Sequence, residues 1–76
     1  MLINEAARKC GITKKAVQYY VEQGLVDPKV LENGYRDFSE EDTKVLKRVV
    51  LYRKLGLSIR EIRRVLEDRG EISGIF

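Results

Sequence analysis

The chain has no histidine and a single cysteine, Cys10, among its 76 residues. Without histidine, neither a Cys/His nor a Ser/His/Asp catalytic set can form, and no glycine-rich phosphate loop is present. A lone cysteine cannot close an internal disulfide, which favours a reducing, intracellular location. Because Cys10 has no companion ligands for a metal ion, we expect it to pack in the core. These absences argue against an enzyme and predict no cofactor.

Long apolar runs and a secretory leader are also missing. No stretch of about 18 or more apolar residues occurs, so the sequence predicts no transmembrane helix. The start, MLINEAARKCGI, lacks the basic segment and apolar stretch of a signal peptide. We therefore expect a cytoplasmic protein that does not contact a membrane.

The length and charge of the chain set further bounds. Its 76 residues form one small domain. A domain of this size buries only about 60% of the surface that its unfolded chain exposes, so a deep substrate cavity is not expected. The 15 basic and 12 acidic side chains give a net charge of +3, which permits nucleic-acid binding without requiring it.

Two short helices are expected at the N-terminal end. Apolar residues at helical spacing mark residues 3–10, and Gly11 ends that helix. Thr13 is typical of an N-cap and opens a second helix over residues 14–23, which ends at Gly24. Two short helices joined in this way outline a helix-turn-helix.

A β-hairpin is expected next. Pro28 prevents helix continuation, and short extended stretches follow around residues 29–31 and 35–38. Between them, Asn33 and Gly34 are a strong short-range hairpin signal, since both residues tolerate the positive φ of a tight turn. We interpret this hairpin as a two-stranded wing.

Two further helices complete the expected fold. Capping-box patterns begin at Ser39 and at Ser58 and open helices that reach about residues 55 and 68. The acidic cluster after Ser39 is explained by this capping rather than by catalysis. The element order helix-helix-wing-helix-helix predicts a mainly α winged helix-turn-helix over residues 1–68. Residues 69–76 are expected to form an irregular tail.

The second helix carries the most informative surface. A polar face near its N-terminus consists of Lys14, Lys15, Gln18 and Tyr19. Duplex DNA requires such a face, because cations meet phosphates, an amide bonds adenine edges and a phenol donates to a phosphate. The positive end of the helix dipole adds to this attraction. The alternative is an ordinary solvated helix face.

Arg36 is the candidate contact on the wing. It follows the predicted turn, where a projecting hairpin reaches a neighbouring DNA groove. The alternative is an ion pair with Asp37 or Glu32 within the hairpin.

The third helix is more apolar than a four-helix domain needs. Its apolar positions are a core stripe of Leu46, Val49 and Val50, broadened by Val45, Leu51 and Tyr52. One explanation is that a partner or missing chain covers part of this face. The other is a wide core face on a small protein.

Taken together, these segments resemble the N-terminal DNA-binding domain of the MerR family of bacterial transcription regulators. The resemblance runs from Ile3 to about Leu66. It rests on short motifs in the family's order: Ile3-Asn4-Glu5-Ala6-Ala7, Gly11-Ile12-Thr13, Tyr19-Tyr20, Gly24-Leu25-Val26, Asn33-Gly34-Tyr35-Arg36, Phe38-Ser39-Glu40-Glu41-Asp42, Leu55-Gly56-Leu57-Ser58 and Glu61-Ile62. Each motif is short, but the ordered set is specific.

The resemblance implies sequence-specific binding of double-stranded DNA, with the second helix in the major groove and the wing on the flanking backbone. It also implies a homodimer on a pseudo-palindromic promoter site. Activators of this family distort an over-long promoter spacer so that RNA polymerase engages both elements. By position, the implied contacts are Thr13, Lys15, Gln18 and Tyr19 on the recognition helix and Tyr35 and Arg36 on the wing; Lys14 and Lys29 complete the expected DNA-binding set.

Two departures from the family pattern bear on this prediction. The family usually has arginine before the paired tyrosines, where this chain has Gln18, and a neutral amide makes weaker phosphate contacts. The family also dimerises through a long helix after the fourth helix, with an effector domain beyond, and residues 69–76 supply neither. The chain is expected to be an excised DNA-binding domain or a naturally short relative. Because residues 1–76 lack a long heptad stretch, we expect this chain alone to be chiefly monomeric.

Two other functions fit the same sequence. One is a phage or transposon protein that uses this fold architecturally, as an excision or packaging factor. The other is a protein-interaction module whose apolar third helix docks a partner. Failure to bind any DNA at low salt would favour the second.

Overall fold

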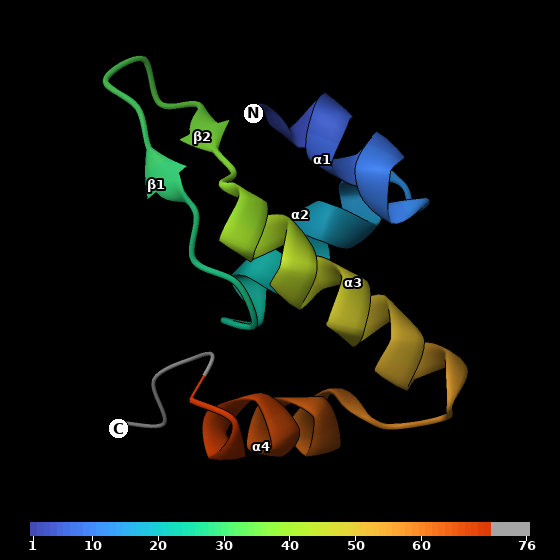
Figure 1. Ribbon diagram of the computed structural model, residues 1–76. Coiled ribbons are helices and arrows are strands. Elements are labelled where there is room, and N and C mark those ends of the chain that lie inside the picture. Colours follow the sequence, from blue (N-terminus) through green and yellow to red (C-terminus); the bar gives the residue numbers. More distant parts are fainter. Residues whose placement is uncertain (71–76) are drawn as a thin grey trace.

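The computed structural model describes residues 1–70, which fold as four helices and a two-stranded hairpin (Figure 1). In chain order the elements are α1 (Ile3–Cys10), α2 (Lys14–Glu22), β1 (Lys29–Val30), β2 (Arg36–Asp37), α3 (Glu40–Lys54) and α4 (Ile59–Asp68). This order confirms the predicted winged helix-turn-helix. Of the tail predicted over residues 69–76, the part beyond Gly70 lies outside the described residues.

Side-chain caps open three of the four helices. The Oγ1 of Thr13 accepts a hydrogen bond from the N–H of Ala16 at 3.0 Å, which confirms Thr13 as the N-cap of α2. Both predicted capping boxes are present, one at Ser39 and one at Ser58. In the second box the carboxylate of Glu61 accepts from the backbone N–H of Ser58 at 2.8 Å, and this bond lowers the pKa of Glu61. The helix boundaries therefore follow from local sequence.

The acidic cluster at the start of α3 has structural partners, although only Asp42 takes part in the predicted capping box. Asp42 closes the capping box by accepting from the N–H of Ser39 at 2.9 Å. Glu40 pairs with Lys9 of α1 at 3.1 Å, a contact that lowers the pKa of Glu40. Glu41 lies 3.5 Å from Lys44 one turn later. These carboxylates cap and brace α3.

The start of the chain holds the hairpin against the helices. The ammonium group of Met1 donates to Oδ1 of Asp37 at 2.6 Å and to the carbonyl of Phe38 at 2.8 Å. The N–H of Phe38 in turn donates to the carbonyl of Met1 at 2.6 Å. The two strands are two residues long, shorter than the expected stretches 29–31 and 35–38. A hairpin this short depends on its ties to the body.

The hairpin and its tight turn are confirmed, but only Gly34, and not Asn33, takes the positive φ that both residues tolerate. The N–H of Gly34 donates to the carbonyl of Leu31 at 2.9 Å, and the N–H of Leu31 donates to the carbonyl of Tyr35 at 2.7 Å. Among the described residues, only glycines have a positive φ, and Gly34 has 87°. This is a three-residue loop in which a type I turn precedes one left-handed residue. Asn33 supports the loop differently, because its Oδ1 accepts from the N–H of Tyr35 at 3.1 Å.

The core consists of two clusters of buried side chains that meet on α3. The first joins α1, α2 and the hairpin to α3 and consists of Ala6, Ala7, Val17, Val26, Phe38 and Leu46. The second joins α3 to α4 and consists of Leu25, Val49, Ile62 and Leu66. Tyr20 and Val45 pack against both clusters. Helix α3 is therefore the element that links the two halves of the domain.

The broad apolar face of α3 is mostly core. Val45 and Tyr52 are half-buried and pack against the clusters. Leu51 and Leu55, by contrast, are 51% and 67% exposed at the C-terminal end of the helix. A wide core therefore explains Val45 and Tyr52, whereas Leu51 and Leu55 form an exposed apolar edge, and a partner or further chain that covers this edge stays a prediction.

Cys10 packs in the core, as predicted. Its side chain lies against the first cluster, with Sγ 3.8 Å from the carbonyl oxygen of Thr43. Burial raises the pKa of the Cys10 thiol, and the charge of Lys47 lowers it by a smaller amount. Across residues 1–70, no three metal-ligating side chains converge. In the same part of the chain, no helix has the length and apolar character needed to cross a bilayer.

Candidate nucleic-acid interface

Helix α2 presents the predicted polar face to solvent. The exposed side chains are Lys14, Lys15, Gln18 and Tyr19. The two lysines lie in the first turn, where the helix dipole already favours anions. The hydroxyl of Thr13 caps this turn and keeps its proton available as a donor. The opposite face is anchored by Val17, which is fully buried. The N-terminal end of α2 is therefore rigidly held and electropositive.

The hairpin exposes a second set of polar groups. Tyr35 is 62% exposed and Arg36 is half-buried. Within residues 1–70, Arg36 forms no ion pair with Asp37 or Glu32, so the predicted alternative of a hairpin ion pair is wrong. The carboxylate of Asp37 is taken by the ammonium of Met1 instead. The guanidinium of Arg36 is therefore available to an external anion.

Lys29 lies in a different electrostatic setting. It is exposed at the start of β1 and stands opposite Asp37 in the antiparallel register. The hydrogen bond and charge of the N-terminal ammonium lower the pKa of Asp37, and the charge of Lys29 contributes a smaller part in the same direction. The charge of Lys29 is thus partly balanced within the hairpin.

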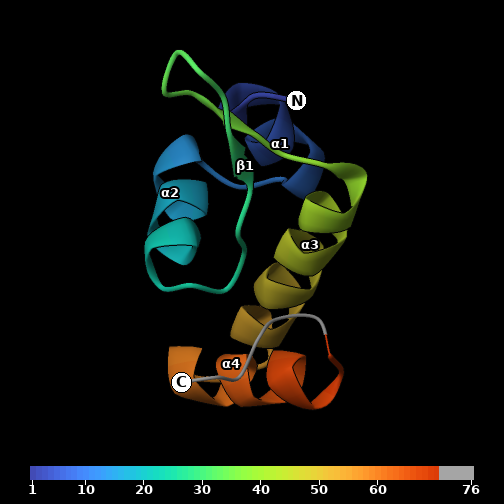
Figure 2. The same ribbon diagram turned by 90° about the vertical axis from the view of Figure 1, so that its left-hand side faces the viewer.

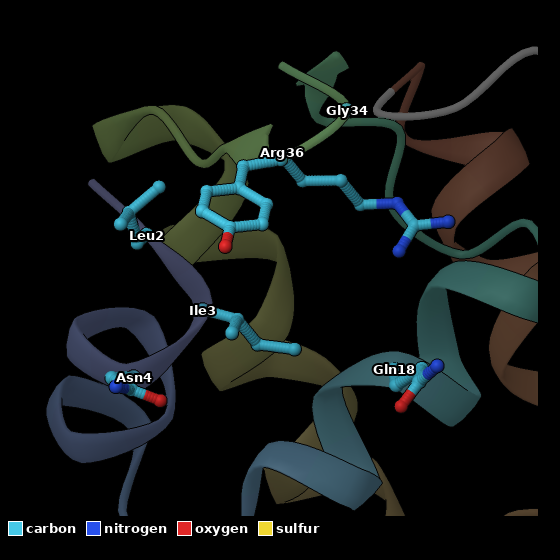
Figure 3. A pocket seen from close by; sticks show the side chains of 7 residues that line it. Leu2, Ile3, Asn4, Gln18, Gly34 and Arg36 are labelled. Atoms are coloured by element: carbon cyan, nitrogen blue, oxygen red, sulfur yellow. The ribbon is translucent and has the colours of Figure 1, made fainter. Parts of the chain in front are cut away.

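An open hollow of about 410 Å³ lies between α1, α2 and the hairpin. Its lining consists of Leu2, Ile3, Asn4, Gln18, Gly34, Tyr35 and Arg36, none of which is acidic. Figure 3 shows the guanidinium of Arg36 extending toward the side of the hollow that carries Gln18, with Leu2 and Asn4 on the far side. Figure 2 shows that α2 and the hairpin loop lie on the same side of the molecule, with α3 on the other side.

The structure brings together part of the predicted set around this hollow. Gln18, Tyr35 and Arg36 line it, although they come from an α-helix and a hairpin 17 or more residues apart. The remaining predicted residues lie outside it: Thr13, Lys14, Lys15 and Tyr19 on α2, and Lys29 on β1. An amide, a phenol and a guanidinium around one open hollow are suited to phosphate oxygens and base edges.

Sequence reasoning missed the start of α1 as part of this surface. Leu2 is 46% exposed and Asn4 is exposed, and both line the hollow with Ile3. The helical spacing of residues 3–10 does not show which end of α1 lies beside the hairpin. The hydrogen bonds between Met1 and the end of β2 bring that end there. The one local hint was Asn4, a polar residue that follows three apolar ones.

The fold agrees with comparisons with known proteins. The family model described as "MerR HTH family regulatory protein" matches residues 1–69. The chain belongs to the MerR family. The resemblance seen in the motifs is thereby confirmed.

Similar MerR-family sequences are transcription regulators of bacteria. The regulator HmrR of Rhizobium leguminosarum bv. viciae is 37% identical over 76 residues, which cover 96% of this chain and 59% of that protein. The regulator CueR of Salmonella typhi is 35% identical over 77 residues, which cover 100% of this chain and 51% of that protein. The chain thus spans about half the length of these relatives.

Two solved structures of MerR-family regulators have the same fold. One is a transcriptional regulator from Bacillus cereus, with a TM-score of 0.80 and 31% sequence identity over 87% of this chain and 50% of that one. The other is HiNmlR, described as a MerR family regulator lacking the sensor domain, in complex with promoter DNA. It matches with a TM-score of 0.83 and 27% identity over 91% of this chain and 53% of that one.

Proposed function

We propose that this chain is the sequence-specific DNA-binding domain of a MerR-family transcription regulator. Helix α2 enters the major groove, and the hairpin contacts the backbone beside it. The observation that carries this proposal is the hollow shared by Gln18, Tyr35 and Arg36, which faces the same side as the electropositive end of α2. The complex of the structurally similar HiNmlR with promoter DNA supports it.

The proposed contacts divide into positioning and reading groups. Lys14 and Lys15 neutralise phosphates, and Thr13 and Tyr19 donate hydrogen bonds to the same backbone. On the hairpin, phosphates are bound by Tyr35 and Arg36, with Lys29 nearby. Gln18 reads a base edge, since its amide both donates and accepts. Most of the affinity then comes from the backbone, and the specificity comes from α2.

We infer a regulator without catalytic activity that acts in the cytoplasm, as its similarity to transcription regulators supports. In a full-length protein, residues 1–68 form the DNA-binding domain, and the tail after them leads to a dimerising helix. The homodimer binds a pseudo-palindromic promoter site and affects RNA polymerase indirectly, through promoter geometry. The chain of 76 residues by itself is chiefly monomeric, which sedimentation at micromolar concentration tests; a tight dimer would contradict it.

The salt dependence of binding to duplex DNA tests the proposed function. The probe is a duplex that the chain itself selects from a randomised pool. If about four or five cations of each domain meet phosphates, log K falls against log[salt] with a slope of about −4 per bound domain. Failure to select any duplex, or a binding curve that is flat between low and moderate salt, would contradict the proposal.

The uncovered edge of α3 favours a second candidate function, a protein-interaction module. Leu51 and Leu55 are more than half exposed at the C-terminal end of α3. Contiguous exposed apolar patches mark surfaces that other proteins cover, and these two leucines are one turn apart. Under this alternative, the chain selects no duplex at low salt, and substitution of these leucines abolishes its interactions.

A further inference from the structure

We infer that Arg63 of α4 is a positioning residue for α2, the proposed recognition helix. Its guanidinium caps the C-terminal end of α2 and supplies the positive charge that this end lacks, so DNA affinity depends on Arg63 without any contact between Arg63 and DNA. This inference rests on the DNA-binding role proposed above for α2. It assigns a function to a side chain that lies 40 residues beyond Gln23, the residue whose carbonyl it binds.

The guanidinium of Arg63 lies against the C-terminal end of α2 and the glycine that follows it. Its Nη2 donates a hydrogen bond to the main-chain carbonyl of Gln23, and the bond is partly buried. The guanidinium also passes over the backbone of Gly24. A Cβ atom at position 24 would lie 3.2 Å from Nη1 of Arg63, and the φ of 76° at Gly24 further disfavours any side chain there. Gly24 thus both ends the helix and leaves room for the arginine.

The remaining hydrogen bonds show why a cap from elsewhere is needed. The N–H of Gly24 donates to the carbonyl of Val21 at 3.0 Å, and the N–H of Leu25 donates to the carbonyl of Tyr20 at 3.1 Å. This pair is a Schellman motif, which satisfies carbonyls in the last turn. The carbonyl of Gln23 lies beyond the reach of that motif. The guanidinium from α4 provides its donor.

The charges of α2 run against its own dipole. Lys14 and Lys15 occupy the first turn, Glu22 ends the helix, and no basic residue lies in the last turn. A helix is stabilised by the opposite arrangement, with acids at its start and bases at its end. The two lysines serve the proposed DNA contacts, so the helix cannot correct this locally. Arg63 places a cation at the C-terminal end from outside.

Helix α4 is a firm support for this contact. Its buried residues Ile62 and Leu66 belong to the second core cluster, and so does Leu25, two residues beyond the carbonyl that Arg63 binds. Figure 1 shows α4 lying next to the end of α2 and the segment that follows it. Because Gln18 and Tyr19 lie on the turn before this end, an unanchored end would loosen the surface that meets DNA.

Paired substitutions of Arg63 and its exposed neighbour Arg64 test the inference on the full 76-residue chain. Both Arg63→Gln and Arg64→Gln remove one charge from α4, so a general electrostatic effect is equal in the two variants. We expect Arg63→Gln to weaken binding to the selected duplex about tenfold at a temperature where both variants are folded. The slope of log K against log[salt] stays unchanged, since no phosphate contact is lost. Arg63→Lys keeps the charge and recovers part of the affinity.

Amide hydrogen exchange gives a readout that does not require DNA. In Arg63→Gln we expect faster exchange at residues 20–25, the end of α2, and unchanged exchange in the middle of α3. Equal affinity of the folded Arg63→Gln variant, an equal loss in Arg64→Gln, or a salt slope reduced by about one would overturn the inference. If Arg63→Gln does not fold, Arg63→Lys provides the test, because it removes the guanidinium. Wild-type DNA affinity of Arg63→Lys together with unchanged exchange at residues 20–25 would overturn the inference that the guanidinium of Arg63 anchors α2.

The two proposals fail in distinguishable ways. A wild-type chain that selects no duplex contradicts the proposed function and, with it, the role of Arg63 in DNA binding. The exchange experiment then tests the anchor by itself, because faster exchange at the end of α2 supports it and unchanged exchange overturns it.

Discussion

Helices α2 and α3 differ in how they arrange charge. Helix α3 has three acidic residues in its first turn and Arg53 and Lys54 in its last, the arrangement that the helix dipole favours. Helix α2 begins with two lysines and has no basic residue in its last turn. The charges of α3 therefore favour its own stability, whereas those of α2 fit the DNA contacts proposed for it and leave its C-terminal end to Arg63 of another helix.

The hairpin resembles α2 in that contacts from other parts of the domain stabilise it. Its strands are two residues long, and Val30 and Tyr35 are each 62% exposed. What holds it lies at its base, where Phe38 is buried and the ammonium of Met1 binds Asp37. Both parts of the proposed interface, α2 and the hairpin, are therefore stabilised by contacts with the rest of the domain. The following predictions test this division, from the largest expected effect to the smallest.

The largest effect is expected at the base of the hairpin. Phe38 is 1% exposed in the first core cluster, so Phe38→Ala should cost about 3–5 kcal/mol of unfolding free energy. Such a loss is a large share of the marginal stability of a small domain. Tyr35→Ala, at the exposed end of the same hairpin, should change stability by less than about 0.5 kcal/mol while weakening DNA binding. Urea denaturation of both variants measures the contrast, and equal losses of stability would contradict the division.

The next prediction distinguishes the role of Gln18 on α2 from that of Arg36 on the hairpin. Gln18→Ala should relax the preference for one base step, at a cost of roughly 1–3 kcal/mol if the amide makes a bidentate contact. Arg36→Ala should weaken binding to all sequences alike, because a phosphate contact carries little base information. Repeating the duplex selection with each variant measures the difference. If both variants lose affinity uniformly, Gln18 is not a base reader.

The sequence was sufficient to predict most helix ends, because caps and glycines act locally. Thr13, Ser39 and Ser58 cap the helices they were expected to open. The conformation of Asn33 was not predictable, since this residue tolerates a positive φ but instead uses its side chain to hold the three-residue loop. A choice between two turns that the same residues permit depends on strand register, which is a tertiary property.

The exposed face of α2 was predictable from helical spacing, but its surroundings were not. The start of α1 lines the hollow because Met1 pairs with the end of β2. Arg63 meets Gln23 because α4 packs on the second core cluster. Both are contacts between residues more than 30 positions apart, and no local pattern in the sequence encodes them.

A smaller effect is expected at the helix caps. Ser39→Ala and Thr13→Ala each remove a side-chain cap and should each cost about 1 kcal/mol of stability. Only Thr13→Ala should also weaken DNA binding, because Thr13 opens the helix that meets the duplex. Denaturation and binding curves for both variants measure the two quantities. A loss of affinity in Ser39→Ala that matches the loss in Thr13→Ala would argue against α2 as the recognition helix.

The smallest effect is a pH dependence at the base of the hairpin. The Met1 ammonium lowers the pKa of Asp37 below its ordinary value, so this contact stabilises the fold above that value of about 3.9. The stabilisation is lost as the pH falls through the lower pKa of the folded state. Acetylation of the N-terminus should therefore reduce stability at neutral pH and have progressively less effect in acid. In Asp37→Asn, the effect of acetylation should no longer depend on pH. In the wild-type chain, an effect of acetylation that is equal at every pH would contradict the assignment.

The central claim is that α2 and the hairpin form one DNA-binding face, and backbone amide chemical shifts during titration with the selected duplex test it most directly. The account predicts changes concentrated at residues 13–19 of α2, at residues 33–36 of the hairpin and at Asn4 beside them. The exposed edge at Leu51 and Leu55 should be unaffected. Changes concentrated at that edge, with α2 and the hairpin unperturbed, would contradict the account.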